Sequence, residues 1–140
     1  MNENKNKHLE FIHNTINRMS GNSFLIKGWT ISIISVLFIF TDKEMNEEFL
    51  LISIIAVIVF WYLNAFFLQQ ERKFRAVYDK VRILPDEEID FSMSTDDFKK
   101  GKFSLLSAFF GKTIWPLYLG ILTMVSIGKY LLESTVANNV

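Results

Sequence analysis

The stretch LLISIIAVIVFWYLNAFFLQQERKFRAVYDKVR, Leu50 to Arg82, begins as an uncharged apolar run and ends as a heavily charged segment. No glycine or proline interrupts it, so we predict a single helix from Phe49 to about Arg82. At about 1.5 Å per residue this helix is about 50 Å long, whereas a hydrocarbon core is about 30 Å thick. The stretch therefore predicts one helix that lies partly in lipid and partly in water.

Two further segments share this apolar character. Residues 24–41 contain one charge, Lys27, and residues 113–128 contain none. Uncharged runs of about 18 or more residues are typical of membrane spans, and flanking lysines extend a shorter run by laying their methylene groups along the apolar layer. Of the 140 residues, 50% are hydrophobic, and these are arranged in blocks rather than with an amphipathic period throughout.

We therefore predict an all-α integral membrane protein that forms a single domain over residues 1–140. The expected spans are residues 24–41, 49–68 and 113–132. The other expected segments are an amphipathic helix in residues 1–23, a loop at 42–48, a cytoplasmic helix and loop at 69–112, and a tail at 133–140.

Basic residues indicate the orientation of these spans. Residues 69–112 hold nine of them, and residues 1–23 hold three, whereas the loop at 42–48 has one lysine against four acids and the tail at 133–140 has no basic residue. Because lysine and arginine are retained on the cytoplasmic side, we expect the N-terminus and residues 69–112 in the cytoplasm. The loop at 42–48 and the C-terminus are then external.

Composition argues against several classes of function. The chain has no cysteine, and its formal net charge of zero gives no general attraction to nucleic acid. Residues 1–23 lack the apolar core and cleavage site of a signal peptide, so we expect the first span to be retained. Walker, dinucleotide, H-E-x-x-H and G-x-S-x-G motifs are absent. We expect neither enzymatic activity nor a cofactor.

Two groups of side chains invite a metal-binding interpretation. His8 and His13, with Glu10 between them, are five residues apart and so do not share a helix face. The acidic turn at 86–90 lacks the alternating spacing and the glycine of a calcium loop. We expect solvated side chains at both places and no metal site.

Two apolar stripes lie outside the predicted spans. Leu9, Ile12, Ile16 and Met19 recur at helical spacing, which predicts a helix that ends at Gly21–Asn22 and packs on its own protein or lies in the membrane interface. A second stripe follows the apolar part of the opening stretch. It consists of Phe74, Val77, Tyr78 and Val81. This face is the candidate for binding a partner or another copy, and the N-terminal helix and residues 89–110 are alternative covers.

The segment after this helix has less regular spacing. Pro85 disfavours helical geometry in the residue before it, so the helix is expected to end there. Ser94 is a candidate N-cap of a short helix that ends at Lys99–Gly101. Residues 103–110 are apolar but short, which favours an interfacial approach to the third span, with a possible kink at Pro116.

Within the predicted spans, small and polar residues are candidates for helix contacts or for lining a pore. Asn64 is the most informative of them, because an amide in hydrocarbon is costly unless it is hydrogen-bonded to another helix. Ser53, Gly120 and Gly128 would allow close helix approach. We expect Asn64 to face another helix, with a pore lining as the alternative.

Four segments, taken in order, resemble a known group of proteins: FIHNTINRM, NSFLIKGWTI, FWYLNAFFLQQERKFRAVYDKVR and DFSMST. They are similar to small bacterial membrane proteins encoded beside cytosolic signalling or TIR-like genes in anti-phage defence loci. The overall plan also resembles the small multi-span membrane effectors of nucleotide-signalling defence systems. The similarity covers about residues 9–115, and its most specific element is FWYLNAFFLQQERKFR continuing into YDKVR. It implies an effector in the inner membrane and assigns no catalytic residue.

Two functional hypotheses follow. In the first, the chain oligomerises when triggered by a cytosolic signal or partner and perturbs or depolarises the membrane. In the second, it is a non-catalytic membrane anchor or scaffold that holds a soluble signalling enzyme through residues 72–82. The expected partners are thus the lipid bilayer, further copies of the chain and a possible cytosolic protein, with no nucleic acid.

Overall fold

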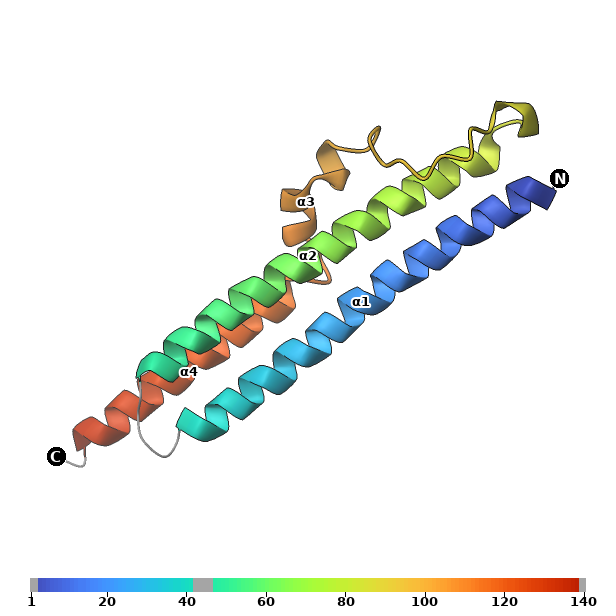
Figure 1. The fold of residues 1–140 in the computed structure, drawn as a ribbon. Helices are drawn as coiled ribbons and strands as arrows, with labels where there is room; N and C mark the ends of the chain where they lie inside the picture. The colour runs from blue at the N-terminus through green and yellow to red at the C-terminus, as the bar shows by residue number, and fades with distance from the viewer. Residues whose placement is uncertain (1–2, 42–46, 139–140) are drawn as a thin grey trace.

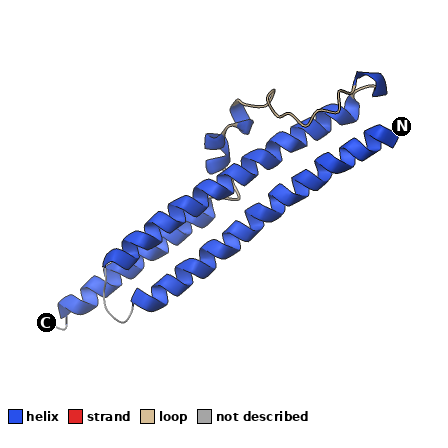
Figure 2. Ribbon diagram, in the orientation of Figure 1, coloured by secondary structure: helices blue, strands red, loops and turns tan. Residues whose placement is uncertain are grey.

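The structure is a computed structural model that describes residues 3–41 and 47–138. Within these two ranges the regular elements are all helices and no strand occurs, as Figure 2 shows. The elements are α1 Glu3–Thr41, α2 Glu47–Ile83, the 3-10 helices η1 Asp86–Glu88 and η2 Gly101–Phe103, α3 Leu105–Phe109 and α4 Trp115–Asn138. The prediction of an all-α chain is confirmed.

Helices α1 and α2 form a long antiparallel hairpin (Figure 1). Helix α4 packs against α2 at the closed end of this hairpin, and residues 84–114 return along α2 from its open end. We call residues 24–41, 51–68 and 115–131 the apolar half, and residues 3–23 and 69–100 the charged half. The helices α1 and α2 run through both halves, while η2 and α3 lie at the boundary.

Helix α2 confirms the prediction made from the opening stretch. It runs without a break from Glu47 to Ile83, and it stops just before Pro85. Proline excludes helical geometry in the residue that precedes it, which explains why the helix ends at this point. The apolar run and the charged run of the sequence therefore form one helix.

Helix α1 differs from the prediction. Instead of ending at Gly21–Asn22, it continues to Thr41, so residues 3–23 are not a separate helix. An internal glycine costs only about 1 kcal/mol relative to alanine. Ile16 and Ser23, on either side of Gly21, are both buried, and this packing against the rest of the chain outweighs the cost.

The prediction of a short helix from Ser94 to Gly101 is wrong. The Ser94 hydroxyl accepts a hydrogen bond from the Asp96 N–H (3.2 Å), and the Phe98 N–H donates to the Thr95 carbonyl (3.0 Å), but only a single turn forms. Gly101 has a φ of 62°, a left-handed conformation that suits glycine and opens η2. The cap-like serine therefore stabilises a turn.

The start of α4 also differs from expectation. Pro116 is the second residue of this helix, where its missing N–H is not needed, so it does not kink a longer helix. The helix continues to Asn138, and the third span at residues 113–132 stays a prediction. Residues 103–110 form the end of η2 and the short helix α3, which packs against α2.

Two of the described helices are long enough and apolar enough to cross a membrane, over Glu3–Ile39 and Leu51–Ile83. In α2, only 22% of the most apolar part is buried inside the chain. Its outer face carries exposed large side chains, namely Leu51, Ile52, Ile55, Ile58 and Val59. The core helix of a water-soluble domain would be mostly buried, so the apolar half lacks the inside-outside pattern of such a domain.

Candidate functional site

Asn64, on α2, lies between all three long helices. Its side chain is fully buried. The Ser23 hydroxyl of α1 donates a hydrogen bond to Asn64 Oδ1, and Asn64 Nδ2 donates to the Tyr118 hydroxyl of α4 over 3.2 Å. One amide therefore joins α1, α2 and α4 through its acceptor and its donor.

Tyr118 extends this set of contacts. Its hydroxyl donates to the Phe60 carbonyl of α2 at 3.2 Å and lies 3.4 Å from the Thr30 hydroxyl of α1. The Thr30 hydroxyl in turn donates to the Ile26 carbonyl at 2.7 Å. We call Ser23, Thr30, Asn64 and Tyr118 the polar network. Leaving one such buried group unpaired costs about 1–3 kcal/mol, so each member holds the others in place.

Apolar and aromatic side chains enclose the polar network. Ile34, Val57, Ile114 and Val125 form a buried cluster with the Tyr118 ring. Trp61 Nε1 donates to the Phe109 carbonyl of α3 at 3.0 Å, and the Trp61 ring stacks on Phe109 and on Tyr118 with centroid distances of 4.3 and 5.6 Å. Helix α3 thus adds aromatic rings beside the network.

The other predicted contact residues do not join the network. Ser53 is buried on α2, about three turns from Asn64. Gly128 lies against α1, since a Cβ added there would come within 2.6 Å of the Phe38 ring. A Cβ added at Gly120 would meet no atom within 4 Å among the described residues. A pore-lining role for any of the four residues stays a prediction.

In the charged half, the predicted partner face is covered from within the chain. Val77 and Val81 are buried in one cluster with Leu9, Ile12 and Ile16 of α1 and with Ile89, and Phe74 and Tyr78 pack at its edge. Both intramolecular covers considered from the sequence, the N-terminal helix and the segment that follows α2, therefore contribute. Binding of a partner or another copy through Phe74, Val77, Tyr78 and Val81 stays a prediction.

Lys5 fastens the open end of the hairpin. Its ammonium donates to the Leu84 carbonyl at 2.6 Å and lies 3.4 Å from an Asp86 carboxylate oxygen, while its side chain is only 8% exposed. The last carbonyls of a helix have no partner within it, so a buried cation satisfies one of them. Sequence reasoning used Lys5 only as an orientation signal, because its contact partners are 79 or more residues away along the chain.

Exposed ion pairs hold the connection that returns along α2. Lys80 binds Asp97 at 2.8 Å, and this hydrogen bond raises the pKa of Lys80. Within the connection, the hydrogen bond from Lys99, assisted by that from Ser94, lowers the pKa of Asp96. Pairs exposed to this degree contribute little to stability.

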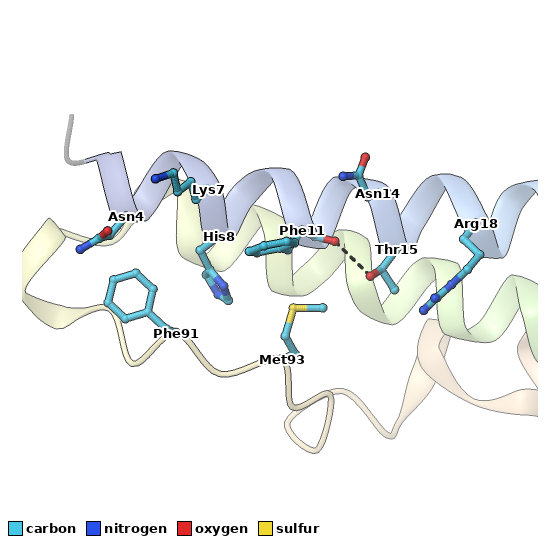
Figure 3. Close-up of a pocket in the computed structure, with 9 residues that line it drawn as sticks. All are labelled: Asn4, Lys7, His8, Phe11, Asn14, Thr15, Arg18, Phe91 and Met93. Carbon is cyan, nitrogen blue, oxygen red and sulfur yellow. Dashed lines mark hydrogen bonds between the residues drawn. The ribbon is translucent and has the colours of Figure 1, made fainter.

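A pocket of about 900 Å³ opens between the N-terminal part of α1 and residues 91–93 (Figure 3). The Phe11 and His8 side chains extend from α1 toward the Phe91–Met93 segment, and Arg18 lies at the far end. The His8 Nε2 atom is buried and has no hydrogen-bond partner in the described structure. The pocket is thus an open feature of the charged half.

The histidines do not converge on a metal site. The His8 ring contacts the Phe91 ring edge-on at 5.5 Å, whereas the His13 ring lies 6.3 Å from the Tyr78 ring. Residues 3–41 and 47–138 contain no group of three histidine, cysteine, aspartate or glutamate side chains that could hold a metal ion.

Sequence reasoning missed three of the four network members. Ser23, Thr30 and Tyr118 are common residue types in spans, and only the positions of Ser23 and Thr30, seven residues apart and so on one face of a helix, offered a signal.

Comparison of the chain with known protein families, curated proteins and solved structures finds no match.

Proposed function

We propose that the chain is an effector of the bacterial cell membrane that oligomerises when a cytosolic signal or partner triggers it, and then perturbs or depolarises that membrane. In this proposal the apolar half lies in the bilayer and the charged half in the cytoplasm. The N-terminus is cytoplasmic, the C-terminus is external, and α4 is the third span. The defence role rests on the sequence resemblance alone.

The observation that carries the proposal is the continuity of α1 and α2. Each helix runs from the charged half into the apolar half without a break, so a displacement at the open end of the hairpin is transmitted along a rigid element. Where the two halves meet, α1 and α2 are joined by the neutral side chains of Ser23 and Asn64, and Asn64 also binds Tyr118 of α4. Separation of the helices would expose these groups to lipid, which favours reassembly with other copies or with water.

Induced expression with a potential-sensitive dye tests this function. We expect the wild-type chain to depolarise cells once triggered. Asn64→Leu should raise depolarisation in untriggered cells, because the resting contacts of α1 and α4 are weakened. Tyr62→Phe is the matched control, since Tyr62 is half exposed on the outside of α2 and should behave as wild type. A normal potential in all three strains at equal expression contradicts the proposal.

The alternative is a membrane anchor for a soluble enzyme. It is favoured by the exposed basic side chains near the end of α2, such as Arg75 and Arg82, which an acidic protein surface could bind. This function predicts a normal potential together with co-purification of one soluble protein. Arg75→Glu with Arg82→Glu should then abolish the co-purification.

The orientation has its own test. A C-terminal alkaline phosphatase fusion should be active, because that enzyme folds only outside the cytoplasm, and a C-terminal green fluorescent protein fusion should be dark. The reverse pair of results would place the C-terminus inside and remove α4 as a third span.

A further inference from the structure

The ionisable side chains that line the pocket at the N-terminal end of α1 are all basic. They are Lys7, His8 and Arg18, and no carboxylate among the described residues lines the pocket. Lys7 binds Glu3 at 2.6 Å, but this pair is fully on the surface and joins neighbouring turns of one helix, so Lys7 can exchange it for another anion. The pocket therefore favours a negatively charged occupant.

Aromatic rings stand exposed in the same pocket. Phe11 is 66% and Phe91 46% exposed, whereas the aliphatic side chains of Ile12 and Val77 are buried in the core of the charged half. In Figure 3 both rings border the open space between α1 and the Phe91–Met93 segment. Exposed rings beside a cationic surface offer a stacking platform for a flat ligand.

Spacing along α1 places cations on either side of the Phe11 ring. At about 1.5 Å per residue, Lys7 lies about 6 Å from Phe11 along the helix axis and Arg18 about 10 Å in the other direction. Asn14, one turn beyond Phe11, adds a side-chain amide that both donates and accepts hydrogen bonds. The volume of about 900 Å³ lies in the range of roughly 300–1,000 Å³ that is typical of small-molecule sites.

Two energetically unfavourable features occur together in this pocket. His8 Nε2 is buried without a hydrogen-bond partner, and the His8 and Phe91 rings meet edge-on with their centroids 5.5 Å apart. Phe91 itself has a φ of 52°, a left-handed conformation that bulky residues rarely adopt. Unpaired buried groups and strained backbones are typical of sites where a ligand completes the structure.

We propose that this pocket binds a small organic anion that carries a flat aromatic ring. The ring stacks on Phe11, and the anionic group binds Arg18 or Lys7. The Phe91 ring moves aside on binding, and a polar group of the ligand reaches His8 Nε2. The inference concerns binding alone and does not depend on what the chain does to a membrane.

Calorimetric titration of the full chain in nanodiscs of zwitterionic phosphatidylcholine tests the proposal. Adenosine monophosphate and 2-naphthoate serve as probes, because they combine a flat ring with a phosphate and with a carboxylate, respectively. Adenosine supplies a ring without the charge, and ribose 5-phosphate supplies the charge without an aromatic ring. We expect at least one probe to bind at least tenfold more tightly than the adenosine or ribose 5-phosphate controls. The two probes distinguish a phosphate ligand from a carboxylate ligand.

Exposed residues provide variants that leave the fold intact. Phe11→Ala and Arg18→Gln should each weaken binding of that probe at least fivefold, a size typical of lost stacking or charge contacts. Phe110→Ala and Arg82→Gln change exposed residues outside the pocket and should alter affinity less than twofold. The imidazole ¹⁵N resonances of His8 should shift on binding, and those of His13, which does not line the pocket, should not.

Three results would overturn the proposal. The first is no saturable binding of either probe at about 1 mM, a Kd that corresponds to only about −4 kcal/mol. The second is equal binding of adenosine or ribose 5-phosphate, which would show that only a ring or only a charge is recognised. The third is binding that Phe11→Ala, Arg18→Gln and the His8 resonances all leave unchanged. If the chain depolarises cells but binds neither probe, the binding proposal fails and the proposed membrane function is unaffected.

Discussion

The two halves of the hairpin are built from the same two helices and differ in what they bury and expose. In the charged half, the buried cluster is aliphatic and includes Ile12 and Val81, and the exterior carries most of the charged side chains together with a few exposed apolar ones such as Phe11. In the apolar half, fully buried positions include Asn64 and Thr30, while large aliphatic side chains such as Ile58 are exposed. The first pattern is that of a protein in water, where apolar burial stabilises the fold. The second pattern suits apolar surroundings, where the hydrophobic effect does not drive helices together and packing and hydrogen bonds between them stabilise the fold.

Under the proposed function, this difference suits one helix to two environments. The hydrophobic effect fixes the register of α1 on α2 in the charged half, because Ile12 and Ile16 have to meet Val77 and Val81. In the apolar half, register depends on directional bonds from Asn64, which permit few alternatives. The halves are therefore expected to respond differently to the same kind of substitution.

The largest difference is expected for truncation of an isoleucine. Ile12→Ala should destabilise the chain by about 2–4 kcal/mol, because Ile12 is fully buried in the charged half. Ile58→Ala removes the same atoms from an exposed site in the apolar half and should cost well under 1 kcal/mol in a lipid-like environment. Unfolding in mixed micelles with rising dodecyl sulfate, followed by circular dichroism, gives both values. Equal losses would mean that the two halves are packed alike.

The buried cation at the open end is expected to rank next. Lys5→Met should cost about 1.5–3 kcal/mol, because it removes a hydrogen bond from a charged donor to the Leu84 carbonyl and leaves that carbonyl unpaired. Lys7→Met is the matched control, since its pair with Glu3 is exposed and should contribute at most about 1 kcal/mol. Amide exchange of the last turn of α2 should accelerate only in the Lys5 variant. Similar exchange in both variants would remove the fastening role of Lys5.

The polar network allows a further test of the comparison between the two halves, this time of hydrogen bonds between the helices. A double-mutant cycle with Asn64→Leu and Tyr118→Phe should give a coupling energy of about 0.5–1.5 kcal/mol, the size found for hydrogen bonds between membrane helices. The same cycle with Tyr62→Phe in place of Tyr118→Phe should give a value near zero, because Tyr62 is exposed on another face. A Tyr118 coupling no larger than that of Tyr62 would show that the network does not hold the helices.

The smallest expected effect is a gain. Gly21 is exposed inside α1, and an added Cβ there meets nothing within 4 Å, so Gly21→Ala should stabilise the chain by about 0.5–1 kcal/mol. Gly111→Ala is the contrasting variant, because its Cβ would lie 2.8 Å from the Leu68 side chain and 2.9 Å from the Ala108 carbonyl. It should destabilise the chain. Loss of stability with Gly21→Ala would indicate that α1 ends or bends at this residue.

The long helices could be predicted from the sequence wherever the signal was local. The uninterrupted stretch from Phe49 and the stop at Pro85 determine α2, and both are read from neighbouring residues. The continuity of α1 through Gly21 could not be predicted in this way, because it depends on burial of Ile16 and Ser23 against distant residues.

For the candidate sites, too, local features could be predicted from the sequence and contacts between distant residues could not. Asn64 could be singled out as a polar residue in an apolar run, but its partners Ser23 and Tyr118 are 41 and 54 residues away. The pocket brings α1 beside Phe91 through a turn that only the folded chain defines. Residue types indicated which groups needed partners, and the fold decided which partners they received.

The most direct test of the two-environment account is a cysteine accessibility profile along the exposed face of α2. The chain has no cysteine, so single substitutions can be placed without background. In membrane vesicles, cysteines at Ile55 and Ile58 should be protected from a charged maleimide, whereas those at Asp79 and Arg82 should react at the rate of an exposed thiol. All four positions are exposed within the chain, so the fold of the single chain does not create this difference. Rapid reaction at all four positions would contradict the account.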